Sequence, residues 1–230
     1  MSFKLVFFCE ADYYILKRNR QPIKMVSWFT IKRKFSNLLY RGIFYRFGYG
    51  RPDRRHNWEE GYAGGYWDHL ESEDESERYK VISRLVQRGS DSPSVFDVGC
   101  GKGILYEYLK KTVSEFEYLG IDISENAVAE ARTRSPEASF RQMDFDREIV
   151  DQKFDIIIFN ETIEYFVRPL SKLLHCAAKN LLPGGRFIIS MYKGHDGLWN
   201  TITPQFKVLE EIDIQNKKRQ RWKIKLMQPK

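Results

Sequence analysis

The sequence has few cysteines and no long hydrophobic run, and each absence excludes a class of protein. Its 230 residues include only Cys9, Cys100 and Cys176, an odd number without a Cys-x-x-Cys pair. This excludes a disulfide-stapled domain and predicts a reducing compartment and no zinc or other metal site. No segment reaches the ~18–20 uncharged apolar residues of a membrane-spanning helix, which is therefore excluded. Aromatic residues make up 15% of the chain, enough apolar surface to predict a folded rather than a disordered protein.

Acidic residues are scarce in the first 55 positions. Residues 1–55 contain 13 Lys and Arg but only three Asp and Glu, a net charge of +10. Residues 56–230 contain 25 Lys and Arg and 28 Asp and Glu, a net charge of −3, so the whole chain carries +7. The difference predicts a basic N-terminal extension, residues 1–55, and a mildly acidic domain, residues 56–230. Charge confined to one arm is weaker evidence for nucleic-acid binding than evenly spread basicity.

Part of the extension has the pattern of an amphipathic helix. Within residues 24–47, apolar residues recur mostly three or four positions apart, the period of one helix face: Trp28, Ile31, Phe35, Leu38, Leu39 and Ile43. Three interpretations stay open: packing on the acidic domain, peripheral contact with a membrane surface, and binding of nucleic acid. No small-residue cleavage site is present, so no signal peptide is predicted. We expect a cytoplasmic protein, with attachment at a membrane surface as the alternative.

The rest of the chain alternates between segments typical of strands and of helices. Strands are expected at 94–98, 117–121, 138–143, 154–159, 186–192, 206–214 and 221–227. Helices are expected after Ser72, Gly103 and Ser124, and over residues 169–182, ending at Pro183-Gly184-Gly185. The alternation predicts an α/β fold with a doubly wound, mainly parallel, seven-stranded sheet. The last two strands, joined by a short polar turn, predict an antiparallel hairpin.

The helix after Ser72 begins with an acidic run. Ser72 and Glu75 have the spacing of a capping box, in which the glutamate reaches back to the first turn. Acidic side chains also suit the positive end of the helix dipole. The run is therefore interpreted as a helix start and not as a metal site.

Polar residues gather at the predicted carboxyl ends of the strands. The first strand leads into Gly99-Cys100-Gly101-Lys102-Gly103 and then a helix, a unit that presents backbone N–H groups to a ligand. Ile104 stands where the dinucleotide fingerprint G-x-G-x-x-G requires glycine. Asp122, Asp144 and Asn160-Glu161 close the second, third and fourth strands. Parallel sheets bind ligands at this edge, so the pattern predicts a nucleotide-type ligand.

These motifs resemble those of class I S-adenosylmethionine-dependent methyltransferases. The resemblance is carried by Val95–Gly103, Leu119–Asp122, Met143-Asp144 and Leu182–Phe187, and it covers about residues 57–230. It implies a Rossmann-like methyltransferase fold, methyltransferase activity and S-adenosyl-L-methionine as the cofactor. An antiparallel strand at the end of the sheet is also typical of this family.

The resemblance also implies roles for matching positions. Asp97 and the glycine turn would hold the methionine part of the cofactor, and Asp122 would bind its ribose hydroxyls. Asp144 and its neighbours would contact the adenine, and Asn160 would lie near the transferred methyl group. The cofactor-binding residues implied in this way are Asp97, Gly99, Cys100, Gly101, Gly103, Asp122, Ile123, Met143, Asp144, Phe145 and Asn160.

A general base would assist methylation of an oxygen or of an ammonium nitrogen, because the acceptor loses a proton. The candidate catalytic residues are His195, in the loop after the fifth strand, and Glu161, after the fourth, with Glu164 as a further candidate. Four aromatic residues precede the cofactor-binding motifs and are expected to cover the substrate or to join the core: Trp58, Tyr62, Tyr66 and Trp67.

The residues after the fourth strand bear on the acceptor. Asn160-Glu161-Thr162-Ile163 lacks the Pro-Pro pair of enzymes that methylate DNA bases or protein glutamine. The segment looks like small-molecule members, including some acting on sugars, although many of those carry histidine at the position of Tyr165. We therefore expect a small-molecule acceptor, such as a sugar or glycan intermediate. The alternatives are an RNA methyltransferase that uses the basic extension and a non-catalytic binding protein of the same fold.

Overall fold

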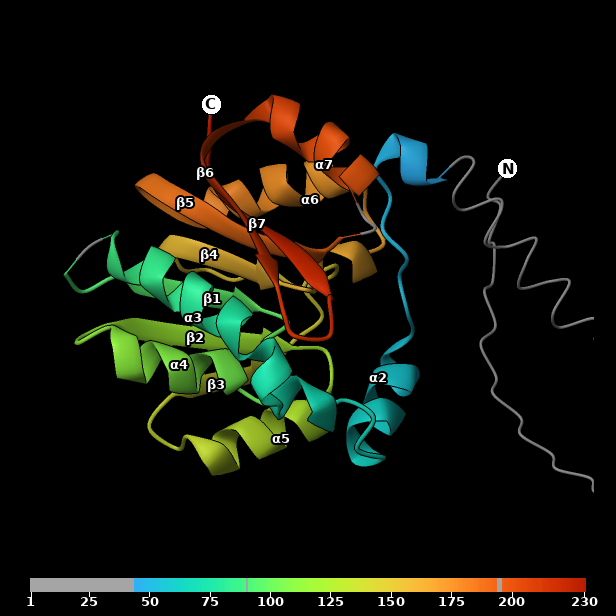
Figure 1. The fold of residues 1–230 in the computed structure, drawn as a ribbon, viewed down its shortest axis with the longest axis vertical. Coiled ribbons are helices and arrows are strands. Elements are labelled where there is room, and N and C mark those ends of the chain that lie inside the picture. Colours follow the sequence, from blue (N-terminus) through green and yellow to red (C-terminus); the bar gives the residue numbers. More distant parts are fainter. Residues whose placement is uncertain (1–43, 90, 194–195) are drawn as a thin grey trace, which may run out of the picture. The chain divides into compact units, whose positions relative to one another are not determined.

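The structure, a computed structural model, describes residues 44–89, 91–193 and 196–230 (Figure 1). The helix expected within residues 24–47 lies outside this range except for the 3₁₀ turn η1 (Phe44–Phe47). His195 also lies outside it. Among the described residues, no helix is long and apolar enough to cross a membrane. The division into residues 1–55 and 56–230 stays a prediction.

One seven-stranded sheet forms the centre of the domain, in the order β3-β2-β1-β4-β5-β7-β6. The strands are β1 (Ser94–Val98), β2 (Glu117–Asp122), β3 (Ser139–Gln142), β4 (Phe154–Asn160), β5 (Leu181–Tyr192), β6 (Phe206–Gln215) and β7 (Arg221–Pro229). The first five are parallel, whereas β7 runs antiparallel to both β5 and β6. This confirms the predicted α/β sheet and its terminal hairpin, whose second strand inserts next to β5.

Helices cover both faces of the sheet (Figure 1). The α-helices are α2 (Arg55–Ala63), α3 (Glu73–Gln87), α4 (Ile104–Thr112), α5 (Glu125–Arg134), α6 (Leu170–Ala177) and α7 (Asp196–Ile202). Short 3₁₀ helices are η2 (Asp68–Glu71), η3 (Ile163–Tyr165), η4 (Ala178–Asn180) and η5 (Thr203–Gln205). Apolar residues of α3 and α4 join one core cluster, and those of α6 and α7 join another.

Alternating side chains of the central strands feed these two clusters. In β4, Ile156 and Ile158 join the cluster of α3 and α4, whereas Ile157 and Phe159 join that of α6 and α7. All four are at most 2% exposed. A parallel strand covered on both faces is expected to be apolar at nearly every position, which is why its sequence lacks a polar alternation.

The predicted capping box is wrong in one part. Ser72 is the N-cap of α3, but its side chain makes no capping hydrogen bond. The Glu75 carboxylate instead lies 2.8 Å from Nη2 of Arg78, one turn later. The Arg78 side chain is only 2% exposed, and a buried guanidinium needs a carboxylate partner. Glu75 therefore pairs with Arg78 and does not cap the helix, where water can satisfy the free N–H groups.

The predicted helix over 169–182 ends too late. The α-helix α6 ends at Ala177, the 3₁₀ helix η4 follows, and β5 begins at Leu181. Leu181 pairs with Phe154 and Arg186 pairs with Ile156, so residues 182–185 oppose Asp155 alone. Pro183-Gly184-Gly185 therefore forms a bulge within β5 and does not mark the helix end. Proline lacks an N–H donor, and bulges are among the few strand positions that accept it.

Candidate functional site

The glycine turn joins β1 to α4 at the carboxyl edge of the sheet. The amides of Gly99 and Cys100 both donate to the carbonyl oxygen of Ile121 in β2, at 2.8 and 2.9 Å. Gly99, Gly101 and Gly103 have φ angles of +79°, +54° and +75°. This left-handed region is strained for residues with a Cβ atom. The three glycines are thus required by the backbone path of the turn itself.

The side chain of Asp122, at the end of β2, holds this turn in place by hydrogen bonds. Its Oδ2 accepts a hydrogen bond from the Gly101 amide and its Oδ1 accepts one from the Ser124 amide, both at 2.9 Å. Burial raises the pKa of Asp122 to about 6, although these hydrogen bonds favour the ionised form. The predicted ribose-binding carboxylate is therefore held rigidly against the glycine turn.

Asp97 lies in β1, one residue before its end, and is 1% exposed. The Tyr118 hydroxyl donates to its Oδ2 at 2.8 Å. Its Oδ1 is buried and has no hydrogen-bond partner among the described residues. Burial raises the pKa of Asp97 to about 7; the Tyr118 hydrogen bond opposes this rise and Asp122 adds to it. An unpartnered buried carboxylate oxygen is costly unless a ligand donates to it, and the contact of Asp97 with a cofactor ammonium group, which stays a prediction, would supply such a donor.

Several predicted cofactor contacts lie around Asp122. The backbone amide of Met143 donates to the Asp122 carbonyl at 2.8 Å, and the side-chain amide of Gln142 donates to the Ile123 carbonyl at 3.3 Å. Cys100 is 8% exposed, and its side chain lies against Gly120 of β2. The glycine turn, the end of β2 and the end of β3 thus lie together. The contacts of these residues with the cofactor stay predictions.

Asp144 and Phe145 lie at the next position along this edge. Asp144 Oδ1 accepts a hydrogen bond from the Asp146 amide at 3.1 Å, and its Oδ2 lies 3.3 Å from the Arg147 guanidinium. The Phe145 ring packs edge-to-face on Phe96 at 5.7 Å between centroids, and so contacts the core. Their predicted contacts with adenine are not tested by these interactions.

The end of β4 has a strained backbone. Glu161, which follows Asn160, has a φ of +60°, a rare value for a residue with a side chain. Its amide donates to the Ser190 carbonyl and to the Ser190 hydroxyl, at 3.2 and 3.1 Å. Its Oε2 lies 3.7 Å from Nη1 of Arg78. Strain of this kind concentrates at functional sites, and here it turns a carboxylate toward a buried arginine.

Glu164, in η3, is the most buried carboxyl group of this region. It is 3% exposed, and its Oε2 has no hydrogen-bond partner in the described part of the chain. Burial, and then the nearby Glu161, raise the pKa of Glu164 to about 8. The described ranges contain no group of three or more His, Cys, Asp or Glu side chains placed to hold a metal ion. At the end of β4, Glu161 lies near Arg78, and Glu164 follows three residues later in η3.

The segment before α3 that contains Trp58, Tyr62, Tyr66 and Trp67 lies beside the glycine turn; we call residues 58–71 the aromatic segment. A Cβ atom on Gly101 would lie 2.8 Å from the Tyr62 hydroxyl. Trp58 stacks on Trp67 at 5.2 Å between ring centroids and meets Tyr165 edge-to-face at 4.8 Å. Tyr66 meets Trp67 edge-to-face at 4.8 Å. These contacts place the aromatic rings next to the predicted site. That they cover the substrate stays a prediction.

Some contacts of this segment cannot be predicted from the sequence. Glu59 of α2 accepts hydrogen bonds from the Ser124 hydroxyl at 2.7 Å and from the Glu125 amide at 2.9 Å. Burial raises the pKa of Glu59, but these hydrogen bonds outweigh it and lower the value to about 2. A carboxylate at a helix N-terminus is favourable, yet more than 60 residues separate it from α5 and no local pattern indicates the pairing.

Arg78 has a signal that the sequence analysis missed. It lies three residues after Glu75 and four before Ile82, all on the buried side of α3. Its position on the helix face that also carries Ile82 and Leu85 indicates a buried charge that needs partners. The periodicity of α3 therefore indicates that Arg78 is buried, but it does not indicate that Glu161 is one of its partners.

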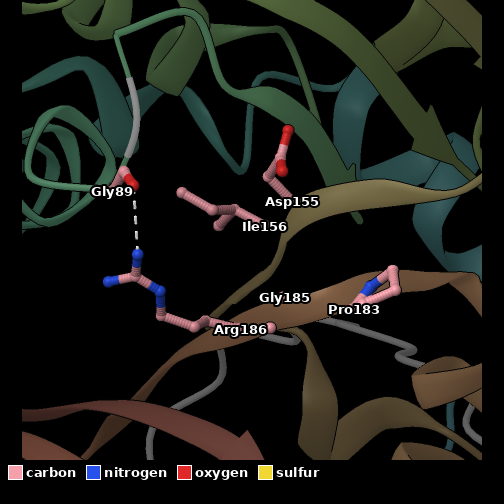
Figure 2. Close-up of a pocket in the computed structure, with 7 residues that line it drawn as sticks. Gly89, Asp155, Ile156, Pro183, Gly185 and Arg186 are labelled. Atoms are coloured by element: carbon pink, nitrogen blue, oxygen red, sulfur yellow. Dashed lines mark hydrogen bonds between the residues drawn. The ribbon is translucent and has the colours of Figure 1, made fainter.

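A cavity of about 260 Å³ lies at the opposite end of the sheet (Figure 2). It is lined by the start of β4 and the bulge of β5, including Asp155, Ile156 and Arg186. The Arg186 guanidinium crosses it to donate to the Gly89 carbonyl at 3.1 Å. The cavity contains none of the predicted site residues. It lies at the amino end of β4, whereas parallel sheets bind ligands at the carboxyl ends of their strands.

Comparison with known proteins agrees with the geometry. The family described as "Methyltransferase domain" matches residues 90–226, more than half of the chain. A malonyl-[acyl-carrier protein] O-methyltransferase from Bacillus cereus is 26% identical over 142 residues, 60% of this chain and 52% of that protein. A ubiquinone biosynthesis O-methyltransferase from Hydrogenovibrio crunogenus is 28% identical over 134 residues, 54% of each protein. The chain thus spans about half the length of these two relatives.

A solved structure supports the fold. The N-methyltransferase NodS from Bradyrhizobium japonicum, in complex with S-adenosyl-l-homocysteine, superposes with a TM-score of 0.61 at 17% identity. The superposition covers 71% of this chain and 92% of NodS. The match of the family, the strand order and the glycine turn confirm the predicted class and cofactor: the chain belongs to the methyltransferase domain family, the class I S-adenosylmethionine-dependent methyltransferases.

Proposed function

We propose that the chain transfers the methyl group of S-adenosylmethionine to an oxygen or nitrogen atom of a small molecule. A sugar or glycan intermediate is the acceptor class favoured by the sequence after β4. The observation that carries the proposal is the unpartnered, buried Oδ1 of Asp97 beside the left-handed glycine turn and Asp122. Together these groups supply an acceptor for an ammonium, close backbone approach and a second carboxylate for hydroxyl groups.

The residues of the chain mainly align the reactants. When bound, S-adenosylmethionine supplies a methyl group that its sulfonium charge already activates. Asp97, the glycine turn and Asp122 would hold the cofactor, and Asn160, at the end of β4, would border the methyl position. Alignment of this kind lowers a barrier by about 7–11 kcal/mol when the reacting atoms are well oriented. The Ser190 hydroxyl lies 2.8 Å from Asn160 Oδ1, which restrains that side chain.

Glu161 and His195 are the proposed bases. The Glu161 side chain is 20% exposed, so an acceptor can reach it, and Arg78 and Ser190 restrain it. The role of His195 rests on its sequence position alone. A decrease of kcat in both Glu161→Gln and His195→Ala, with unchanged cofactor affinity, would support both assignments.

The experiment that tests the cofactor site is calorimetric titration with S-adenosylhomocysteine. Asp97→Asn and Asp122→Asn should each weaken binding by about 10-fold or more, because each removes a charged acceptor. Asp151→Asn, on an exposed residue, is the matched control and should leave the affinity unchanged. Equal affinity in all four proteins, or no binding by the wild type, would refute the proposal.

A second candidate follows from the charge of residues 1–55, which is +10. An RNA methyltransferase that uses this extension would bind RNA with a steep dependence on salt. A membrane-attached enzyme would instead sediment with anionic vesicles through the same residues. A truncated protein that begins at residue 44 lacks nine of the 13 basic residues of this extension. RNA binding or vesicle sedimentation should be lost in it if either alternative is right, whereas binding of a small-molecule acceptor should be unchanged.

A further inference from the structure

Three carboxyl groups surround one buried guanidinium at the end of β4. We call Glu75, Arg78, Glu161 and Glu164 the Glu161 cluster. Arg78 contacts Glu75 at 2.8 Å and Glu161 at 3.7 Å, and both the arginine and Glu164 are at most 3% exposed. The buried Nε of Arg78 and Oε2 of Glu164 have no hydrogen-bond partner among the described residues. One positive charge therefore faces more carboxyl groups than it can neutralise.

The Glu161 cluster is adjacent to the cofactor-binding turn. The Thr162 hydroxyl, next to Glu161, donates to the Val98 carbonyl at 2.7 Å, at the start of the glycine turn. A Cβ atom on Gly99 would collide with the Thr162 side chain. Thr162, the residue after Glu161, is thus packed directly against the segment that would carry the reactive end of the cofactor.

Aromatic rings lie next to the Glu161 cluster through Tyr165. We call Trp58, Tyr66, Trp67 and Tyr165 the aromatic row. Tyr165 follows Glu164 directly and meets Trp58 edge-to-face at 4.8 Å, and Trp58 stacks on Trp67. Burial raises the pKa of the Tyr165 phenol, and the nearby Glu164 and Glu161 add to the rise. Ring faces beside carboxylates form the environment that binds organic cations.

We propose that the acceptor is an amine that is protonated in solution, and that Glu161 holds its ammonium group beside the aromatic row and takes its proton. The inference rests on the proposed methyltransferase function and names the acceptor atom of that same site. The proton moves from the nitrogen to a Glu161 oxygen, and the freed electron pair stays on the nitrogen as the nucleophile. An acceptor with a carboxylate at this position would meet uncompensated negative charge.

The groups that face Glu161 make its role distinct from that of its neighbours. Arg78 and Glu75 reach it from α3, the Ser190 hydroxyl from β5, the Trp222 side chain from β7, and Glu164 and Tyr165 from η3. Burial and the adjacent Glu161 both favour the neutral form of Glu164. Burial raises the pKa of Glu161 as well, and the Arg78 guanidinium opposes that rise. Glu161, whose side chain is 20% exposed, is the carboxyl group that an acceptor can reach, whereas Glu164 acts as a positioning residue behind it.

The test uses two matched triads of probes: benzylamine, benzyl alcohol and benzoate, and glucosamine, glucose and glucuronate. Each is titrated calorimetrically into full-length protein saturated with S-adenosylhomocysteine. At least one amine should bind about 10-fold more tightly than its alcohol and its carboxylate. Glu161→Gln should remove about 10-fold of that affinity, whereas Glu161→Asp should retain most of it because the charge is kept.

Two controls separate the possible failures. Glu210→Gln, on an exposed glutamate paired with Arg88, should leave amine binding unchanged. S-adenosylhomocysteine binding by each variant shows that it is folded, and its absence in the wild type would refute the proposed function itself. If the cofactor product binds but no amine does, if an alcohol or carboxylate binds more tightly, or if Glu161→Gln binds amines normally, the amine proposal is wrong.

Discussion

Lys102, in the glycine turn, makes an ion pair of 2.5 Å with Asp68, in η2 of the aromatic segment. Its Nζ also lies 3.1 Å from Glu130 of α5, and the lysine is 6% exposed. The side chain therefore joins the turn, α5 and the aromatic segment. A second link runs from Arg134 of α5 to Glu71 at 2.6 Å. The aromatic segment is held to the cofactor-binding elements by charge pairs.

We expect Asp68→Asn to loosen this segment without unfolding the domain, since Lys102 keeps Glu130 as its partner. Affinity for S-adenosylhomocysteine should fall by about 2–5-fold, the size expected for a partly exposed ion pair. Amide hydrogen exchange of residues 61–71 should become faster.

Asp213→Asn is the matched control for that variant. Asp213 is 62% exposed against 63% for Asp68, and its partner Lys223 likewise keeps a second carboxylate, that of Glu211. It lies on β6, away from the glycine turn, so neither exchange over residues 61–71 nor cofactor affinity should change. Equal effects of the two substitutions would show that the Asp68 ion pair has no special role.

Gly101→Ala tests whether the turn and the aromatic segment touch. The substitution forces alanine into a left-handed conformation and places its Cβ 2.8 Å from the Tyr62 hydroxyl. Gly184→Ala is the control, because its φ of +81° imposes similar strain while its Cβ would meet nothing within 4 Å. Both should lose about 1 kcal/mol of unfolding free energy to strain.

Only Gly101→Ala should also weaken S-adenosylhomocysteine binding, and Tyr62→Phe in the same chain should restore part of it. The two readouts are chemical denaturation and calorimetric titration. If Gly184→Ala weakens binding to the same degree, the contact with Tyr62 does not matter for the site.

The sequence predicted the sheet because its signals are local. The strands β1, β2 and β4 are short, mainly apolar runs that end at glycine or at an acidic residue, and Asp97, Asp122 and the glycine turn could be placed from β1 and β2 alone. The bulge at Pro183-Gly184-Gly185 was misassigned because the same residues end helices and form bulges. Only the pairing of Leu181 with Phe154 decides between the two.

The acceptor side of the site could not be predicted in the same way. Arg78 and Glu161 are 83 positions apart in the chain, and their 3.7 Å contact depends on how α3 packs against the end of β4. Glu59 and Ser124 meet for the same reason. Such pairs are formed by burial of the helices, and no spacing in the sequence encodes them.

Cofactor affinity should increase with pH because of Asp97. Its pKa is raised to about 7 by burial, so at pH 6 the protonated form cannot accept the ammonium of S-adenosylhomocysteine as a charge. Between pH 6 and pH 8 the affinity should rise by about 10-fold, following the ionised fraction. Asp122, whose pKa is about 6, adds to the slope at the acidic end.

Calorimetric titrations of the wild type and Asp97→Asn over this range check the assignment. The variant should bind more weakly at pH 8 and show a flatter profile, and Asp151→Asn should follow the wild type. An affinity that falls as pH rises would contradict the proposed contact.

Stability should have the opposite dependence on pH, because of Glu164. Its pKa is raised to about 8 in the folded protein, so the native state holds the proton more tightly than the unfolded chain does. A group of this kind contributes most below its unfolded pKa, near 4.5, and its contribution is lost as pH rises through the folded value. Glu164→Gln cannot ionise, so it should gain stability relative to the wild type between pH 5 and pH 8 by more than about 1 kcal/mol.

Urea denaturation of the two proteins at several pH values measures this difference, with Glu115→Gln, on an exposed loop residue, as the control. The control should lose stability with pH in parallel with the wild type, because the other buried carboxyl groups, including Asp97, are unchanged in it. If Glu164→Gln also runs parallel to the wild type, Glu164 is ionised in the folded protein and Arg78 must then compensate two carboxylates in addition to Glu75.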